Sequence, residues 1–232
     1  DGGTAPFEAT LVADEVGSYD FFGAAVSAGD GIIAVGAPLD NAMGTNSGAV
    51  TVFEHDADAG TWTSAAELYP SDGDVDDEFG SSVLVHGAQV IVGAPYAFSS
   101  DEHWTGQVYV YEDTGAGWEE VQRLAPDTGD SDDWYGYAMA GDGDTLVIGA
   151  PATDSTVLHG GAIHIYEWSN DMWSLTQTIA SPLSIVHGHF GNSLSVDDDR
   201  IVVGTPGAGD LGMADAGAIY VYTKGGDGVW TG

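Results

Sequence analysis

Two acidic loops offer the clearest chemistry in this sequence. Hard cations such as Ca²⁺ bind six to eight oxygen atoms, and alternate aspartates on a tight turn can supply them. We therefore predict eight metal ligands, with Ca²⁺ as the cofactor: Asp72, Asp74, Asp76 and Asp77 in the first loop, and Asp127, Asp130, Asp132 and Asp133 in the second. The alternative is a solvated acidic turn in which Asp77 and Asp133 accept hydrogen bonds from loop amides. Neither loop ends in the glutamate of an EF-hand, which favours the alternative.

Histidines form a second candidate metal site. His187 and His189 flank Gly188, and His159 or His164 would add a further imidazole ligand for a transition metal. Histidine pairs are common in loops, however, and the sequence does not reveal the hydrogen bonds that orient such ligands. We therefore favour the interpretation without a metal.

One loop is rich in apolar side chains. Between Tyr96 and Thr105 lie Phe98, His103 and Trp104, which have no counterpart in the repeats described below. Function usually lies in loops that vary over a constant scaffold, so we predict these three as binding residues. The alternative is that Trp104 only covers the edge of a sheet.

Catalytic motifs are absent from the sequence. It has no GxSxG, HExxH, phosphate-binding or dinucleotide-binding pattern, and it has no cysteine. With 37 acidic residues, no carboxylate pair stands out as that of a glycosidase. We predict no catalytic residues and no enzyme activity.

The elements that position these residues repeat four times. An aromatic-glycine pair recurs at spacings of 57, 56 and 55 residues, and a proline follows sixteen residues after each aromatic residue. A glycine-led strand and a tryptophan come next in each unit. The pairs are Phe22-Gly23, Phe79-Gly80, Tyr135-Gly136 and Phe190-Gly191, and the tryptophans are Trp62, Trp118, Trp173 and Trp230. Because the tryptophans repeat in register, we expect them to pack and not to bind a ligand.

Each unit contains four strand-length segments, several of them apolar on both faces. Such strands indicate sheets that lie between neighbouring sheets. Four strands in about 55 residues is the size of a propeller blade. We predict an all-β fold in one domain, residues 1–232: a small β-propeller of four four-stranded antiparallel blades. Their approximate bounds are 13–69, 70–125, 126–180 and 181–232, with residues 4–12 as the N-terminal strand that completes the last blade and closes the ring.

The repeats resemble those of the FG-GAP family, which includes the heads of integrin α subunits. The resemblance rests on FGAAVSAGDGIIAVGAP, FGSSVLVHGAQVIVGAP and the two more divergent units, and it extends over essentially the whole chain. It implies a β-propeller with a role in adhesion or protein recognition. Many integrin repeats carry a calcium loop between their first two strands. The corresponding turns here are short (AGDG, VHGAQ, GDGDT and VDDDR), so those calcium sites do not transfer to this chain.

The charge indicates the environment and excludes some partners. The formal net charge is -34, with three basic residues. Molar salt shortens the Debye length to about 3 Å and relieves the repulsion between carboxylates, so we predict a halophilic source. The alternative is an acidic, calcium-loaded secreted protein. Binding to nucleic acid is excluded because phosphates need basic partners, and no segment is apolar enough for membrane insertion.

We therefore predict a non-catalytic extracellular or cell-surface adhesion module of a halophile that binds protein or glycan through its blade loops. The alternative is a structural subunit of a surface layer, fibre or filament. In that case the N-terminal strand would complete a blade of a neighbouring copy, so that the partner is the chain itself.

Overall fold

The structure is a computed structural model that describes residues 9–14, 17–98, 104–126, 132–154, 157–209 and 216–232. These residues form sixteen strands and no helix, so none of them lies in a helix that could span a membrane. The first two sheets contain β1 (Ala25–Gly29), β2 (Ile32–Ala37), β3 (Ala49–Asp56), β4 (Thr61–Leu68), β5 (Ser82–His86), β6 (Gln89–Ala94), β7 (Gln107–Asp113) and β8 (Trp118–Leu124). The other two contain β9 (Ala138–Asp142), β10 (Thr145–Ala150), β11 (Ala162–Ser169), β12 (Met172–Ala180), β13 (Ser193–Asp197), β14 (Arg200–Thr205), β15 (Ala218–Lys224) and β16 (Trp230–Thr231).

Each sheet is an antiparallel meander of four consecutive strands, which confirms the predicted all-β fold of four four-stranded blades. Local sequence explains the hairpins. Asp30 and Gly31 join β1 to β2, and both have positive φ, as a two-residue hairpin turn requires.

Three hydrophobic cores lie between the four sheets. Alternate residues of each third strand face opposite neighbours. Val108 and Val110 of β7 pack toward the third sheet, whereas Tyr109 and Tyr111 pack toward the first, where both rings contact Phe79. The strands are therefore apolar on both faces because each middle sheet is covered twice.

Glycine is required where successive blades meet. A Cβ on Gly36 of β2 would lie 2.0 Å from the backbone oxygen of Gly80, in the next blade. The contact recurs one blade later, where a Cβ on Gly93 would lie 2.2 Å from the oxygen of Gly136. The glycine of each Gly-Ala-Pro segment thus packs on the aromatic-glycine pair of the following blade.

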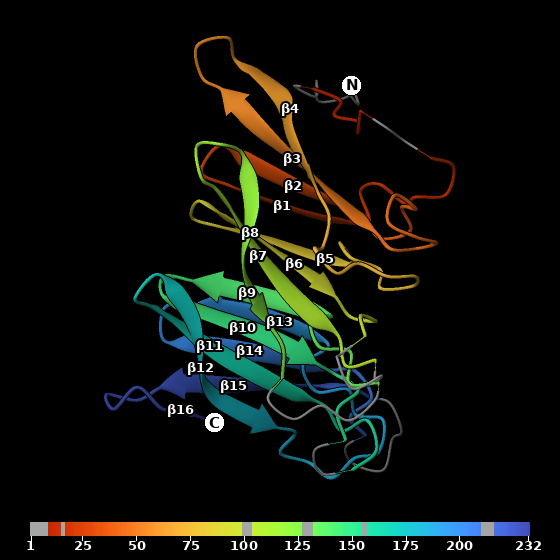
Figure 1. The fold of residues 1–232 in the computed structure, drawn as a ribbon. Helices are drawn as coiled ribbons and strands as arrows, with labels where there is room; N and C mark the ends of the chain where they lie inside the picture. The colour runs from red at the N-terminus through yellow and green to blue at the C-terminus, as the bar shows by residue number, and fades with distance from the viewer. Residues whose placement is uncertain (1–8, 15–16, 99–103, 127–131, 155–156, 210–215) are drawn as a thin grey trace, which may run out of the picture.

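The four blades form an open row and not the closed ring that the sequence predicted. First strands of successive sheets contact one another, β1 with β5, β5 with β9 and β9 with β13. The first sheet lies at the top of Figure 1 and the last sheet at the bottom. Blade 4 consequently leaves Ile219 and Val221 exposed, although the equivalent Val108 and Val110 are fully buried.

The predicted N-terminal strand is wrong for the part that the structure describes. The fourth strand of the last sheet is β16, which the C-terminal segment itself supplies and which pairs with β15. Residues 9–12 lie in no strand, and residues 4–8 lie outside the described residues. The strand β16 is short and pairs with Thr223 and Lys224, at one end of β15.

Candidate recognition surface on the loop edge

The sheets place their connections at two opposite edges. Loops between second and third strands, and the links from one sheet to the next, lie together at what we call the loop edge, on the right of Figure 1. The hairpin turns lie at the other edge, the turn edge. Residues of the repeated pattern hold the loop edge together. Phe79 forms a β-bridge with Gly48, and Phe190 forms one with Gly161, so these two links are attached to the loop of the blade before them.

Five aromatic side chains lie at the loop edge of the second and third blades, as a group of three and a separate pair. Trp134 contacts Tyr96 and Tyr137, with ring centroids 6.1 and 5.9 Å apart. Phe98 and Trp104 form a T-shaped pair at 5.0 Å, and they are 40% and 48% exposed. We call these five residues the aromatic patch. Exposed aromatic side chains in such a group are typical of a protein-binding surface.

Sequence reasoning found Phe98 and Trp104 but missed Trp134 and Tyr137. These two residues flank the repeated Tyr135-Gly136 pair. At the same positions the other repeats have no tryptophan or tyrosine, and the first repeat has Phe21. Departure from the repeat was thus the signal that could have found them. His103, the third predicted binding residue, lies outside the described residues.

The first acidic loop directs its carboxylates to separate partners. Asp72 accepts hydrogen bonds from the Tyr109 hydroxyl at 2.9 Å and from Arg123. Asp76 accepts one from the side-chain amide of Asn46 at 2.7 Å. The Asp77 carboxylate accepts one from the backbone N–H of Asp74 at 2.7 Å. This arrangement corresponds to hydrogen-bonded loop carboxylates, and among the described residues no three acidic side chains converge as metal ligands would.

Burial perturbs two carboxyl groups of this loop. The Asp77 side chain is almost fully buried, and the loss of hydration raises its pKa to about 6, against the lowering effect of the Asp74 and Phe98 backbone groups. Burial also raises the pKa of Glu78, with a further contribution from the charge of Asp76. The Asp77 carboxyl group therefore lies inside the loop, where one of its oxygens accepts the Asp74 N–H.

The second acidic loop is described only in part. Asp127 and Asp130 lie outside the described residues. Asp132 is exposed and donates its backbone N–H to the Trp104 carbonyl at 2.8 Å, whereas Asp133 is buried. Calcium binding by the two acidic loops therefore stays a prediction.

Three of the four candidate histidines meet at the loop edge between the third and fourth blades. The potential ligand atoms of His159, His187 and His189 all lie within 4.8 Å of one another. His164 is elsewhere: it is buried in β11, where its Nδ1 lies 3.3 Å from the Thr178 hydroxyl and its ring packs on Tyr135. The structure thus selects His159 over His164 as the partner of the His187–His189 pair.

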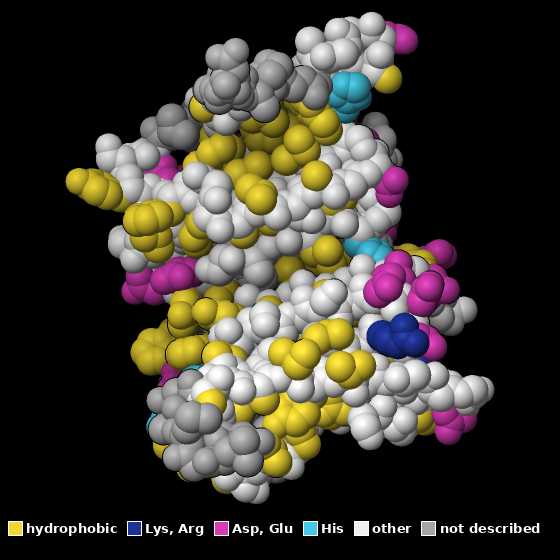
Figure 2. All heavy atoms as spheres, turned by 180° about the vertical axis from the view of Figure 1, so that it is seen from behind, with side chains coloured by type: hydrophobic (Ala, Val, Ile, Leu, Met, Phe, Trp, Pro, Cys, Tyr) yellow, Lys and Arg dark blue, Asp and Glu magenta, His cyan; other side chains and the backbone are white. Residues whose placement is uncertain are grey.

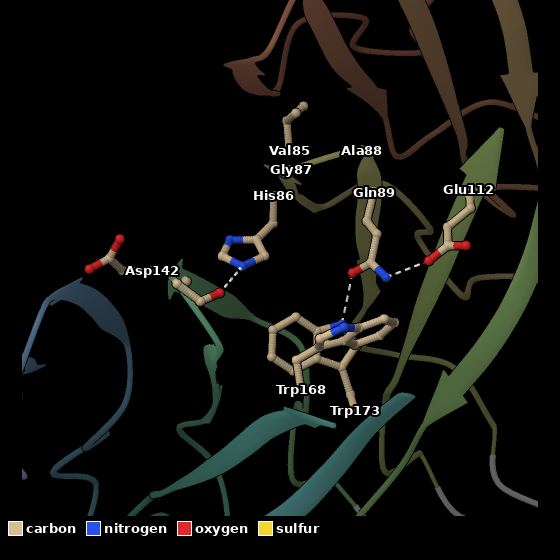
Figure 3. A pocket seen from close by; sticks show the side chains of 11 residues that line it. Val85, His86, Gly87, Ala88, Gln89, Glu112, Asp142, Trp168 and Trp173 are labelled. Carbon is tan, nitrogen blue, oxygen red and sulfur yellow. Dashed lines mark hydrogen bonds between the residues drawn. The ribbon is translucent and has the colours of Figure 1, made fainter. Parts of the chain in front are cut away.

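A hollow of about 570 Å³ lies at the turn edge between the second and third blades (Figure 3). Its polar side chains already bind one another. The Trp173 indole N–H donates to Gln89 at 2.9 Å, and the Gln89 amide donates to Glu112 at 2.6 Å. His86 Nε2 lies 2.8 Å from the Gly143 carbonyl oxygen. Since these groups are satisfied within the protein, the hollow is a weaker candidate site than the loop edge.

The repeated tryptophans have the packing role expected of them. Trp173 and Trp230 are buried, and the indole N–H of Trp118 donates to Glu54 of the preceding blade at 3.1 Å. Together with the Trp173 contact to Gln89, this hydrogen bond ties the outer strands of the second and third blades to the blade before each of them.

Comparison with known families agrees with this architecture. The FG-GAP repeat family matches the chain four times, at residues 6–53, 62–111, 118–166 and 173–222. This chain belongs to the FG-GAP repeat family. The last three matched segments begin at the first or second residue of an outer strand, and all four end in the third strand of a sheet. The family repeat is therefore offset from the structural blade.

The FG-GAP chain is also similar to integrin alpha-7. It is 28% identical to the protein of Rattus norvegicus over 200 residues, which cover 75% of this chain and 16% of the relative. It is 28% identical to the protein of Homo sapiens over 208 residues, which cover 79% of this chain and 16% of the relative. For Mus musculus, a match of 116 residues is 32% identical and covers 47% of this chain and 9% of the relative. The chain thus spans about one sixth of the length of these relatives. FG-GAP propellers of the integrin α type are generally non-catalytic.

Proposed function

We propose that this FG-GAP chain is a non-catalytic recognition or adhesion module of the cell surface or extracellular space that binds a protein partner at its loop edge. The observation that supports this most is the aromatic patch of Tyr96, Phe98, Trp104, Trp134 and Tyr137, at positions where the repeat does not require aromatic residues. Similarity to integrin alpha-7 supports the same class of function.

Charge favours a basic partner. The chain has 37 acidic and three basic residues, and in Figure 2 the basic side chains on that face occupy one spot beside carboxylates. A protein surface with apolar and cationic side chains complements an aromatic patch on such a molecule. In a salt-adapted setting, which we propose as well, the aromatic contacts would supply most of the affinity because salt screens the charges.

Peptide selection tests this proposal. Peptides displayed on phage are selected against the whole chain, and their affinities are then measured by fluorescence anisotropy. Enriched peptides should combine basic and apolar residues, and Trp104→Ala should weaken their binding at least about tenfold, as expected for an exposed aromatic hot spot. The matched control is Val121→Ala, in which an exposed apolar side chain on β8 is shortened. Equal affinity for the parent chain and Trp104→Ala would reject the loop edge as the binding surface.

A second candidate function is assembly of copies into a larger structure through the terminal blades. This candidate depends on the faces of the terminal sheets and not on strand donation, because β16 pairs with only Thr223 and Lys224 of β15. The observation that favours assembly is the free face of blade 4, where Ile219 is 71% and Val221 48% exposed. Figure 2 shows hydrophobic side chains on the surface of both the upper and the lower part of the molecule. The free face of blade 1 on a second copy, which includes the exposed Val26, is the matching occupant because blades already pack in that order within the chain.

Light scattering over a range of concentrations tests assembly. The parent chain should gain mass with concentration, and Ile219→Asp should remain a single chain. Val121→Asp, which adds the same charge on β8, should behave like the parent. A parent mass of one chain at every concentration would exclude this candidate.

A further inference from the structure

We propose that His159, His187 and His189 form a binding site for one divalent transition-metal ion of the Zn²⁺ class. His159 comes from the loop between β10 and β11, and the other two come from the link between β12 and β13. Three imidazoles are a common ligand set for Zn²⁺, and they leave one position for water or another donor. This proposal does not require the protein partner proposed above, although the site adjoins the aromatic patch through Trp134.

The geometry of the three rings suits one ion. The Nδ1 atoms of His159 and His187 lie 3.2 Å apart. With metal–nitrogen distances of about 2.0–2.1 Å, two ligand atoms of a tetrahedral site are about 3.3–3.4 Å apart. The ring centroid of His189 lies 5.9 Å from that of His159 and 6.1 Å from that of His187, and one potential ligand atom of each ring lies within 4.8 Å of the other two.

The backbone fixes the two segments against each other. The N–H of His187 donates to the Leu158 carbonyl at 2.9 Å, and the N–H of His189 donates to the His159 carbonyl at 3.1 Å. The Asp154 carboxylate also accepts the backbone N–H of His159 at 2.7 Å. The three histidines are therefore positioned before any metal binds, which lowers the entropic cost of binding.

His189 has the surroundings of a metal ligand. Its Nδ1 lies 3.2 Å from the Pro151 carbonyl, which can only accept a hydrogen bond, so Nε2 carries the lone pair. The ring stacks on Trp134 with an interplanar angle of 3°. Burial lowers the pKa of His189, and the neighbouring His159 and His187 lower it further.

The repeat provides an internal comparison. At the junction of the first two blades, the same three positions hold Asn46, Asp76 and Glu78. The backbone there resembles that of the histidine site. The backbone N–H of Glu78 donates to the Asn46 carbonyl at 3.0 Å, and all three residues have positive φ. The three histidines also have positive φ, between 48° and 57°.

The scaffold therefore accepts oxygen-bearing side chains at these positions and does not require histidine. The buried aspartate that precedes the aromatic residue by two positions in the other three repeats is also replaced, by Gly188. Replacement of four positions at one junction, with three imidazoles converging, indicates a local function in metal binding.

Titration of the metal-free chain with Zn²⁺ alone as the probe tests the proposal. Isothermal calorimetry is performed in molar NaCl with an excess of Mg²⁺, because Mg²⁺ occupies carboxylate sites and leaves imidazoles free. We expect one tightly bound Zn²⁺ per chain, and His187→Asn should weaken its binding at least about tenfold. His86→Asn, at the turn edge, should bind as the parent does. Absence of a tight site, or equal binding by His187→Asn, would overturn the proposal.

A measurement on the unmodified chain avoids dependence on the variant's folding. Long-range ¹H–¹⁵N spectra of the imidazole rings should show Zn²⁺-dependent shifts for three of the seven histidines, assigned as His159, His187 and His189. Shifts at other histidines in place of these three, or no shifts, would contradict the site.

Discussion

Buried aspartates illustrate how single residues maintain the loop edge. Asp20, Asp77 and Asp133 stand two residues before their aromatic residue, and all three are at most 6% exposed. Asp77 shows the purpose of this position, because its carboxylate accepts the Asp74 N–H inside the loop. The aspartates that the sequence marked as metal ligands thus include at least one that shapes the link between blades.

Asp77→Asn should change how stability depends on pH. The pKa of Asp77 is raised from 3.8 to about 6 in the folded chain, so the folded state binds the proton more tightly than the unfolded state. The resulting stabilisation is complete below 3.8 and is lost as the pH rises through about 6. The asparagine side chain of the variant has no carboxyl group to ionise, but its amide oxygen can still accept the Asp74 N–H. The variant should therefore gain about 2 kcal/mol relative to the parent between pH ~4 and pH ~8.

Urea unfolding of both proteins across that pH range measures the effect. Differences between the two proteins are compared, because the many other carboxylates contribute equally to both. A difference that stays constant with pH would mean that Asp77 titrates alike in the folded and unfolded states.

At the scale of elements, contacts between blades explain the glycines of the repeat. A Cβ on Gly149 of β10 would lie 2.1 Å from the backbone oxygen of Gly191 in the next blade. In blade 4 the equivalent Gly204 has no following blade, and its Cβ would meet the Ser193 side chain, whose Oγ lies at 2.1 Å and can rotate away. The same residue type is therefore under different constraints in blades 3 and 4.

Gly149→Ala should destabilise the chain much more than Gly204→Ala. The first substitution forces two sheets apart and should cost about 1–3 kcal/mol or more, as overpacking does. The second requires one serine rotamer to change and should cost less than about 1 kcal/mol. Urea unfolding of both variants provides the measurement, each serving as the control for the other. Equal losses would show that blade 4 is covered in solution as blade 3 is.

The sequence revealed most of the elements because the repeat is regular. Aromatic-glycine pairs and prolines at fixed offsets located all four sheets, and apolar strands such as β7 indicated neighbours on both faces. It did not reveal the open row, because Leu11 stands eleven residues before an aromatic-glycine pair, as Leu68 and Leu124 in true outer strands do. It also could not choose between His159 and His164, since that depends on which of them faces the loop edge.

At the scale of the whole molecule, the open row gives the two ends of the chain different surroundings from its middle. Ile163 of β11 and Ile219 of β15 occupy the same position in their blades. Ile163 is fully buried in the core between the last two sheets, whereas Ile219 is 71% exposed. Stability should therefore depend on three cores between blades and not on four.

Ile163→Ala and Ile219→Ala test this arrangement as a matched pair. Loss of the buried side chain should lower the free energy of unfolding by about 2–5 kcal/mol. Loss of the exposed one should change it by less than about 0.5 kcal/mol at dilutions where the chain is a single copy. Chemical denaturation measures both values. A large loss for Ile219→Ala under those conditions would indicate that the ring closes on itself.

Salt dependence is the remaining property of the whole molecule, and it follows from the charge. Among the described residues, Arg123, Arg200 and Lys224 pair with a few carboxylates, which leaves most acidic side chains without a basic partner. Raising NaCl from about 0.1 M to about 1 M shortens the Debye length from about 10 Å to about 3 Å. The unfolding temperature should therefore rise steeply over this range, as followed by circular dichroism. Screening is nearly complete at about 1 M, so the steep part should end there, whereas a general salting-out effect would continue to grow with concentration. An unfolding temperature that stays flat up to about 1 M would show that carboxylate repulsion does not limit the stability of this fold.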